Sequence, residues 1–188
     1  MNQNTTDFCR IVRARTTENQ NAFNRLLPSG SLGVAVGLLR QELDSLIRVA
    51  YLCDMGSTCH TAQALIDDAV NGEQWTTTTN RGRQRRITDR EMVDIASQMG
   101  GWVNIIYKFG CGLIHLSNLH DHESNDPFAA AIDPIDTAEI IRYLNQYHSY
   151  PDHDIDKQRL VEYLPKVMGK LVDNTNYYLS QIENSIAA

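Results

Sequence analysis

The residues best suited to chemistry in this chain lie in one stretch, YKFGCGLIHLSNLHDH, from Tyr107 to His122. The stretch begins with the apolar spacing of a helix, contains two glycines that disfavour a helix, and then collects three histidines. Imidazole gains and loses a proton near neutral pH. His115 could therefore move a proton, bind a metal or serve only in packing, and the residues alone leave these three interpretations open.

Two further segments have the residue types of a metal site. His120–His122 places two histidines around an aspartate, but adjacent ligands in a loop do not define a coordination geometry. Asp152–Asp156 alternates carboxylates like the start of a calcium loop, yet Lys157 stands at the sixth position, where such a loop needs glycine. We therefore expect no metal and no cofactor, and we interpret Asp156 as the N-cap of a helix.

A basic run, NRGRQRR, supplies Arg81, Arg83, Arg85 and Arg86 within six residues. Arginines in this density can neutralise the phosphates of a nucleic acid, although nothing in the run predicts readout of bases. The alternative is a plain solvated loop. The net charge of −6 argues against a surface that coats nucleic acid broadly but is compatible with one local basic patch.

Arg40, Asp44 and Arg48 follow one another at intervals of four residues along an apolar helical pattern. The simplest interpretation is a ladder of ion pairs on a helix surface, which contributes a few tenths of a kcal/mol per pair. If these groups are half-buried, they could instead orient a side chain of another helix, and His115 is one candidate.

The apolar periodicity predicts the helices that would hold these residues. We expect helices at 31–55, 58–70, 88–116, 137–148 and 160–186, with a loop at 121–136. Thr88 and Glu91 form the capping box of the third of these. That helix contains Gly100, Gly101, Gly110 and Gly112, which cost about 1 kcal/mol each relative to alanine, so we expect a kink or a closely packed neighbouring helix at these glycines.

Residues 75–87 have a different pattern, with a run of threonines, an Asn-Arg-Gly turn and a short stretch that ends in Ile87. This pattern predicts a small β-hairpin, which Trp75 would anchor to the larger structure.

The chain of 188 residues, with 42% hydrophobic and 21% charged residues, is expected to fold as a single domain over 1–188. The fold class we predict is an all-α bundle of about five to seven helices with the hairpin near 75–87 as an insertion. No apolar run reaches the roughly 20 residues that cross a bilayer, and the N-terminus lacks the apolar core of a secretory signal. We expect a soluble cytoplasmic protein with no membrane partner.

Two helical stretches, LLRQELDSLIRVAYL and YKFGCGLIHLS, together resemble the HEPN-like (higher eukaryote and prokaryote nucleotide-binding) families. The resemblance covers about 30 residues and implies an α-helical bundle, frequently a homodimer. It also implies that active members are metal-independent ribonucleases, which use an arginine and a histidine separated by four to six residues at the dimer interface.

Two pairs in this chain approach that arrangement: Lys108 with His115, and Arg142 with His148. A separation of seven residues is close to two helical turns, which favours the first pair. Lys108 departs from the family pattern, because an ammonium is a point charge where the family has the two-pronged guanidinium.

These observations lead us to expect a HEPN-like, RNA-related protein of a defence or toxin–antitoxin system, either a metal-independent ribonuclease or a catalytically weakened relative. In the enzymatic version His115 transfers the proton, Lys108 contacts the phosphate, and Arg40 and Asp44 orient them; Arg142 and His148 are the reserve pair. The expected partners are a second copy of the chain, RNA, and a cognate antitoxin or other protein. The alternative is a non-catalytic interaction protein that uses the basic run as a docking surface.

Overall fold

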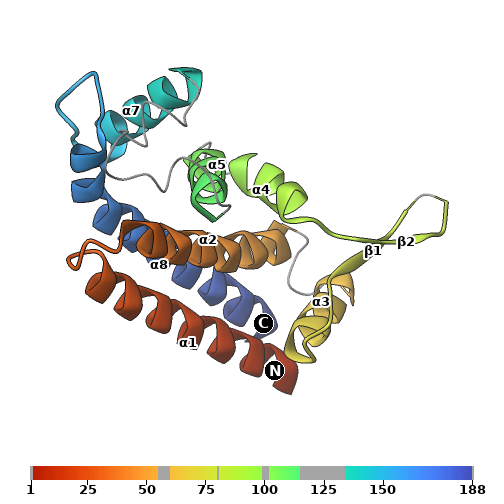
Figure 1. Cartoon of the computed structure of the whole chain (residues 1–188). Coiled ribbons are helices and arrows are strands. Elements are labelled where there is room, and N and C mark those ends of the chain that lie inside the picture. Colours follow the sequence, from red (N-terminus) through yellow and green to blue (C-terminus); the bar gives the residue numbers. More distant parts are fainter. Residues whose placement is uncertain (1, 55–59, 80, 99–101, 115–133, 188) are drawn as a thin grey trace.

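The computed structural model describes residues 2–54, 60–79, 81–98, 102–114 and 134–187. This part of the chain forms seven helices and one two-stranded hairpin (Figure 1), which confirms the predicted all-α bundle with its β insertion. The helices are α1 (Gln3–Leu26), α2 (Leu32–Asp54), α3 (His60–Val70), α4 (Asp89–Gln98), α5 (Trp102–Ile114), α7 (Pro134–His148) and α8 (Lys157–Ala187). The strands are β1 (Thr76–Thr78) and β2 (Gln84–Arg86).

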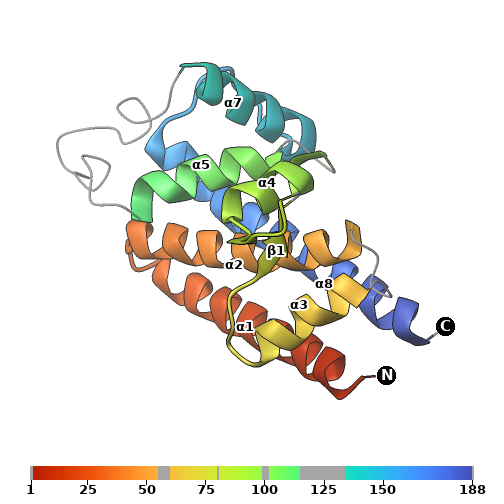
Figure 2. The same ribbon diagram turned by 90° about the vertical axis from the view of Figure 1, so that its right-hand side faces the viewer.

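Helix α2 is the central element of the bundle. It packs against α1, α4, α5 and α8. In Figure 2 it lies between α1 on one side and α4 and α5 on the other, with α7 beyond α5. The apolar positions that predicted this helix are all buried: Leu32, Val36, Leu39, Leu43, Leu46, Ile47 and Ala50.

Helix α1 was not predicted from the sequence. Its buried stripe mixes polar and apolar residues: Thr5, Phe8, Cys9, Val12, Thr16, Asn19 and Phe23. Such a stripe gives little hydrophobic periodicity, because three of its members are threonine or asparagine. The helix begins after Asn2, whose side chain accepts a hydrogen bond from the backbone N–H of Asn4 at 3.1 Å.

The prediction of one helix from 88 to 116 is wrong, because the structure has two helices, α4 and α5. They are separated by residues 99–101, which include the two adjacent glycines and are not among the described residues. The predicted capping box is confirmed at the start of α4. The backbone N–H of Thr88 donates to the Glu91 carboxylate at 2.9 Å, and that of Glu91 donates to the Thr88 hydroxyl at 3.3 Å.

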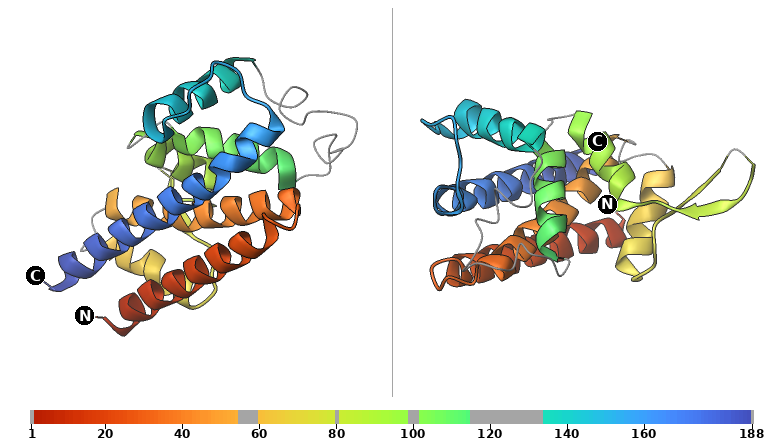
Figure 3. Two further views of the ribbon diagram at one scale, coloured as in Figure 1. Left: turned by 90° about the vertical axis from the view of Figure 1, so that its left-hand side faces the viewer. Right: turned by 45° about the horizontal axis from the view of Figure 1, so that its top comes forward.

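Helix α8 crosses the whole bundle (Figure 3, left) and packs along α2. Its start confirms the interpretation of Asp156 as an N-cap, because the Asp156 carboxylate accepts from the backbone N–H of Arg159 at 2.8 Å. Pro165 lies inside this helix, and its side chain is exposed. None of the described helices is long and apolar enough to cross a bilayer.

Candidate functional site

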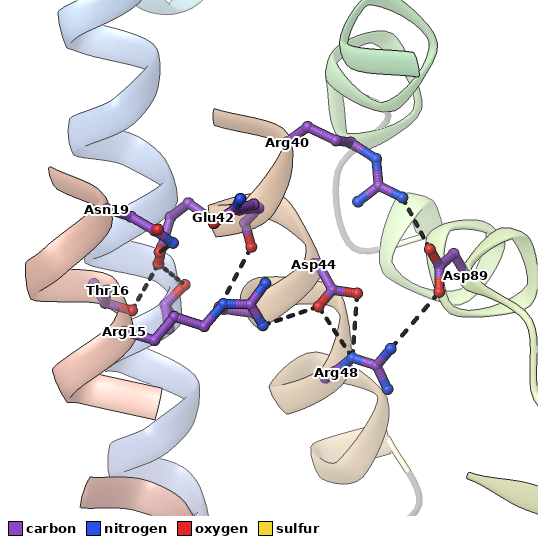
Figure 4. Close-up of polar contacts among 11 residues, drawn as sticks. Arg15, Thr16, Asn19, Arg40, Glu42, Asp44, Arg48 and Asp89 are labelled. Carbon is purple, nitrogen blue, oxygen red and sulfur yellow. Dashed lines mark hydrogen bonds and ion pairs between the residues drawn. The ribbon is translucent and has the colours of Figure 1, made fainter. Parts of the chain in front are cut away.

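The three charged residues at intervals of four on α2 form part of a network that joins three helices (Figure 4). Arg48 Nε lies 3.1 Å from Asp44 Oδ1, and Arg15 of α1 reaches Asp44 Oδ2 at 3.1 Å. Arg40 Nη2 lies 3.0 Å from Asp89 Oδ2 at the start of α4, and Arg48 Nη2 lies 3.7 Å from the other oxygen of Asp89. The network thus fixes α1 and α4 to α2, and it is more than a ladder on one helix surface.

Arg40 is buried, with only 7% of its surface exposed. Its stem packs against α5 at Gly110, where an added Cβ would lie 3.0 Å from the Arg40 Cβ. Its guanidinium lies over the Tyr107 ring, with Cζ 4.6 Å from the ring centroid. This contact confirms that a glycine of α5 allows close helix packing, and it makes α2, α4 and α5 meet around one arginine.

The guanidinium of Arg40 contacts Asp89 and the Tyr107 ring, but its Nε forms no hydrogen bond with a described residue. Burial alone would lower the pKa of Arg40, but Cys111 and the carboxylates of Asp89 and Asp44 outweigh that effect, so the pKa is raised and the group stays charged. Its Nε has no hydrogen-bond partner in the described part of the chain. We call this group of Arg40, Asp89, Tyr107 and Cys111 the Arg40 junction.

Of the other residues predicted to act in catalysis, the structure describes Lys108 but not His115. Lys108 belongs to α5, two residues before Gly110, and its side chain is exposed. His115, together with the histidines at 120 and 122, lies outside the described residues. The structure therefore brings Arg40 and α5 together but leaves the proposed proton-transfer residue undescribed.

The reserve pair on α7 occupies two different surroundings. Arg142 is exposed and lines a groove of about 1010 Å³ between α7 and the segment that contains His153. His148 does not line that groove, and its Nε2 lies 3.0 Å from the Tyr143 hydroxyl. Burial, followed by the charges of Lys170 and Lys166, lowers the pKa of His148. No contact between Arg142 and His148 is found within the described structure.

One cation lies among aromatic rings of two other helices, a contact that was not predicted. The Nζ atom of Lys170, on α8, lies 4.1 Å from the ring centroid of Tyr147, 4.7 Å from that of Trp102 and 4.8 Å from that of Tyr143. Burial lowers the pKa of Lys170. The lysine joins α8 to α5 and α7 through cation–π contacts, and its partners are too far apart in sequence to form a recognisable motif.

A buried carboxyl group was also missed. Glu42 of α2 is fully buried and accepts hydrogen bonds from Thr16 Oγ1 at 2.8 Å, Asn19 Nδ2 at 3.0 Å and Thr175 Oγ1 at 3.2 Å. These donors belong to α1 and α8, which pack against each other and against α2, so the carboxyl lies where three helices meet. Thr16 and Asn19, two of the three polar residues that hid α1 from hydrophobic periodicity, bind this carboxyl.

The acidic segment before α8 binds an arginine. Arg159 Nη1 lies 3.1 Å from Asp152 Oδ2 and 2.7 Å from Asp154 Oδ1, and its Nε lies 3.8 Å from Asp156 Oδ2. The alternating carboxylates are therefore explained by an internal cation and a helix cap.

The hairpin is anchored to the bundle at its base. Trp75 and Ile87 are buried, and the backbone N–H of Ile87 donates to the Trp75 carbonyl at 2.9 Å. The Trp75 ring packs beside Tyr51 and lies under the guanidinium of Arg48, at 5.0 Å. This confirms the predicted role of Trp75 and ties the hairpin to the same α2 network that holds Arg40.

Beyond this base, residues 76–79 and 81–86 project from the bundle as an arm (Figure 1 and Figure 3, right). We call this segment the arm. It pairs Thr76 with Arg86, Thr77 with Arg85 and Thr78 with Gln84, and Gly82 takes a φ of +71° in its turn.

The four arginines of the arm do not share one environment. Arg85 is held at the base by Glu91 of α4, with both guanidinium–carboxylate distances below 3 Å, at 2.6 and 2.8 Å. This bond and the N–H of Thr88 lower the pKa of Glu91 to about 2. Arg81, Arg83 and Arg86 are exposed and form no ion pair with any described residue.

No protein-family model matches the chain, and comparisons with curated proteins and with solved structures give no significant match. The resemblance to the HEPN-like families therefore stays a prediction.

Proposed function

We propose that this protein is a HEPN-like RNA-binding protein whose arm contacts the phosphates of RNA. The observation that carries the proposal is the charge of the arm. Between Trp75 and Ile87 there are four arginines and no acidic residue, so this segment carries +4, while the whole chain carries −6 and the remainder therefore −10. A projecting basic segment on an acidic body attracts a polyanion locally and repels it elsewhere.

The arm is built to present its charges outward. Glu91 neutralises only Arg85, and the bond between them fixes the direction in which the arm leaves α4. Arg81, Arg83 and Arg86 remain exposed and available to phosphate oxygens. Each phosphate contact releases condensed counterions, so binding through these residues should weaken steeply as salt is raised.

The test compares two variants with the same change in charge. Arg83→Ala with Arg86→Ala removes two exposed charges of the arm, and Arg10→Ala with Arg25→Ala removes two exposed charges of α1. RNA binding is measured by fluorescence anisotropy over a series of salt concentrations. We expect the arm variant to bind more weakly, with a salt slope smaller by about one unit per arginine, and the α1 variant to bind like the wild type.

Two outcomes would contradict this proposal. If the two variants lose affinity equally, the effect comes from net charge alone. If the wild type does not bind RNA at low salt, the arm is better interpreted as a docking surface for a protein, as expected for a non-catalytic interaction or assembly protein.

Cleavage of RNA is the second candidate function, and the Arg40 junction favours it. A charged, buried guanidinium, whose Nε has no hydrogen-bond partner among the described residues, lies against α5, the helix that carries Lys108 and precedes His115. In this proposal His115 moves a proton at a ribose 2′-hydroxyl, Lys108 contacts the phosphate, and Arg40 and Asp44 orient the site.

The cleavage proposal is tested with purified wild type and His115→Ala, incubated with labelled RNA in EDTA at low salt. Cleavage by the wild type that the substitution abolishes, with equal melting temperatures, would support a metal-independent ribonuclease. Absence of cleavage by both proteins would leave RNA binding as the function and would refute the catalytic role.

The resemblance also supports a wider proposal, that the protein is a cytoplasmic homodimer acting with an antitoxin or other protein partner in a defence or toxin–antitoxin system. Light scattering coupled to size-exclusion chromatography would test the dimer, and a monomeric mass at micromolar concentration would contradict it.

A further inference from the structure

The two faces of the arm differ, because one packs against the bundle at its base and the other is exposed. Side chains alternate between faces along a strand, so Trp75, Thr77, Arg85 and Ile87 share one face. That face is buried at its base and bonded to α4 through Arg85 and Glu91. The opposite face points away from the bundle, and all four of its side chains are exposed: Thr76, Thr78, Gln84 and Arg86.

The outward face offers only hydrogen bonds and charge. From residue 76 to residue 86 the chain has no aromatic and no aliphatic side chain. Proteins that bind single-stranded nucleic acid stack its bases on aromatic rings, and each such contact contributes about 1–3 kcal/mol. The arm has no ring to supply this interaction, so unpaired bases would gain little from it beyond phosphate contacts.

The outward face matches the exposed groups of an RNA double helix. The major groove of A-form RNA is too deep and narrow for side chains to read, whereas its minor groove is wide and shallow and displays 2′-hydroxyls. The Gln84 amide oxygen already accepts a hydrogen bond from Thr76 Oγ1 at 3.3 Å. The amide N–H groups of Gln84 and the hydroxyl of Thr78 therefore remain for ribose hydroxyls.

We infer that the arm binds double-helical RNA across its minor groove. Thr78 and Gln84 contact 2′-hydroxyls, and the Thr76 hydroxyl oxygen accepts from one. Arg86, on the same face, contacts a flanking phosphate, and Arg81 and Arg83, at the turn beyond the paired strands, contact the phosphates next to it. This inference rests on the proposed RNA-binding function and narrows its target to RNA stems. It also assigns two roles to the side chains of the arm. The hydroxyl and amide groups distinguish RNA from DNA, whereas the arginines contribute affinity for either nucleic acid.

The experiment measures binding of three probes of one sequence: an RNA duplex, its single RNA strand and the corresponding DNA duplex. Wild type is compared with Thr76→Val/Thr78→Val, which keeps the β-branched shape of both side chains but removes both hydroxyls. We expect the wild type to prefer the RNA duplex over the DNA duplex by about tenfold, the effect of one or two lost hydrogen bonds. The single RNA strand keeps its 2′-hydroxyls but does not hold them in the geometry of a minor groove, so it should also bind more weakly than the RNA duplex. The valine variant should bind RNA and DNA duplexes alike and keep the salt slope of the wild type.

Failure of this inference can be told apart from failure of the RNA-binding proposal. Equal affinity of the wild type for single strand and duplex, or for RNA and DNA duplexes, would overturn the inference even if the arm arginines are needed for binding. If Arg83→Ala/Arg86→Ala binds RNA as well as the wild type, the proposed function itself fails. Circular dichroism of each variant checks that the bundle is intact.

Discussion

The buried carboxyl of Glu42 allows a sharp prediction about stability. It is the common acceptor for three side chains on two other helices, Thr16 and Asn19 of α1 and Thr175 of α8. Replacing Glu42 by alanine removes all three hydrogen bonds and leaves three buried donors without their acceptor. The threonine hydroxyls and the Asn19 amide can turn toward carbonyls of their own helices, as the Asn174 amide does toward the Lys170 carbonyl, but those carbonyls already accept helix hydrogen bonds and replace the carboxylate only in part.

The size of the effect follows from these contacts. A hydrogen bond typically contributes about 1 kcal/mol net, and a buried polar group left unpaired costs about 1–3 kcal/mol. For three bonds to a fully buried acceptor, with donors that are re-paired only in part, we expect Glu42→Ala to lower the free energy of unfolding by about 3–5 kcal/mol. Glu42→Gln keeps one carbonyl oxygen and the shape of the side chain, so it should lose roughly half as much or less.

The assay is urea unfolding followed by far-ultraviolet circular dichroism, with the slope of free energy against urea checked to be unchanged. Gln41→Ala is the matched control, because Gln41 is the exposed neighbour on the same helix and should change stability by no more than about 0.5 kcal/mol. A loss below about 1 kcal/mol in Glu42→Ala, or equal losses for alanine and glutamine, would refute the idea that this carboxyl joins the three helices.

Two other predictions concern the contacts of α5 and the arm. Gly110→Ala should destabilise the protein by about 1–2 kcal/mol, because the new Cβ would lie 3.0 Å from the Cβ of Arg40. Gly37→Ala on α2, where no described atom lies within 4 Å of the new Cβ, should stabilise the protein by about 0.5–1 kcal/mol. Thermal melts in which both variants shift stability in the same direction would contradict the close packing at Gly110. The pKa of Glu91, followed by NMR, should lie near 2 and rise toward 4.5 in Arg85→Ala. The pKa of Glu91 is lower in the folded state than in the unfolded state, so the stabilisation from this pair is present above pH 4.5 and is lost as the pH falls toward 2. An unchanged Glu91 pKa in Arg85→Ala would show that this ion pair does not hold the arm.

The parts of the fold that were predictable depend on local signals. Regular apolar spacing predicted α2, the Thr88–Glu91 box predicted the start of α4, and the threonine run with its glycine turn predicted the hairpin. Each of these signals is contained within a few consecutive residues. By contrast, α1 buries Thr16 and Asn19 because Glu42, far along the chain, accepts their hydrogen bonds. A buried stripe of polar residues cannot be recognised from the sequence of its own helix, because the residue that accepts its hydrogen bonds lies in another helix.

The same reasoning explains what was predictable in the candidate sites. The arginines of the arm are adjacent in sequence, so their density was visible at once. The ion pair between Arg40 and Asp89 joins residues 49 positions apart, and no spacing rule connects them. The four-residue intervals on α2 suggested that Arg40 would pair along its own helix, whereas packing of Gly110 on Arg40 directs its guanidinium toward α4 instead.

The use of arginine across the chain strengthens the case for the arm. The chain has 13 arginines, and eight of them form ion pairs with described residues. The five that form none with the described residues are Arg25, Arg81, Arg83, Arg86 and Arg142. Three of these five lie within the arm, a short segment on an otherwise acidic protein. Seven of the nine arginines of the body are paired with a described carboxylate, either between helices or locally in the chain, so a polyanion approaching the described surface would find unpaired guanidinium groups concentrated on the arm.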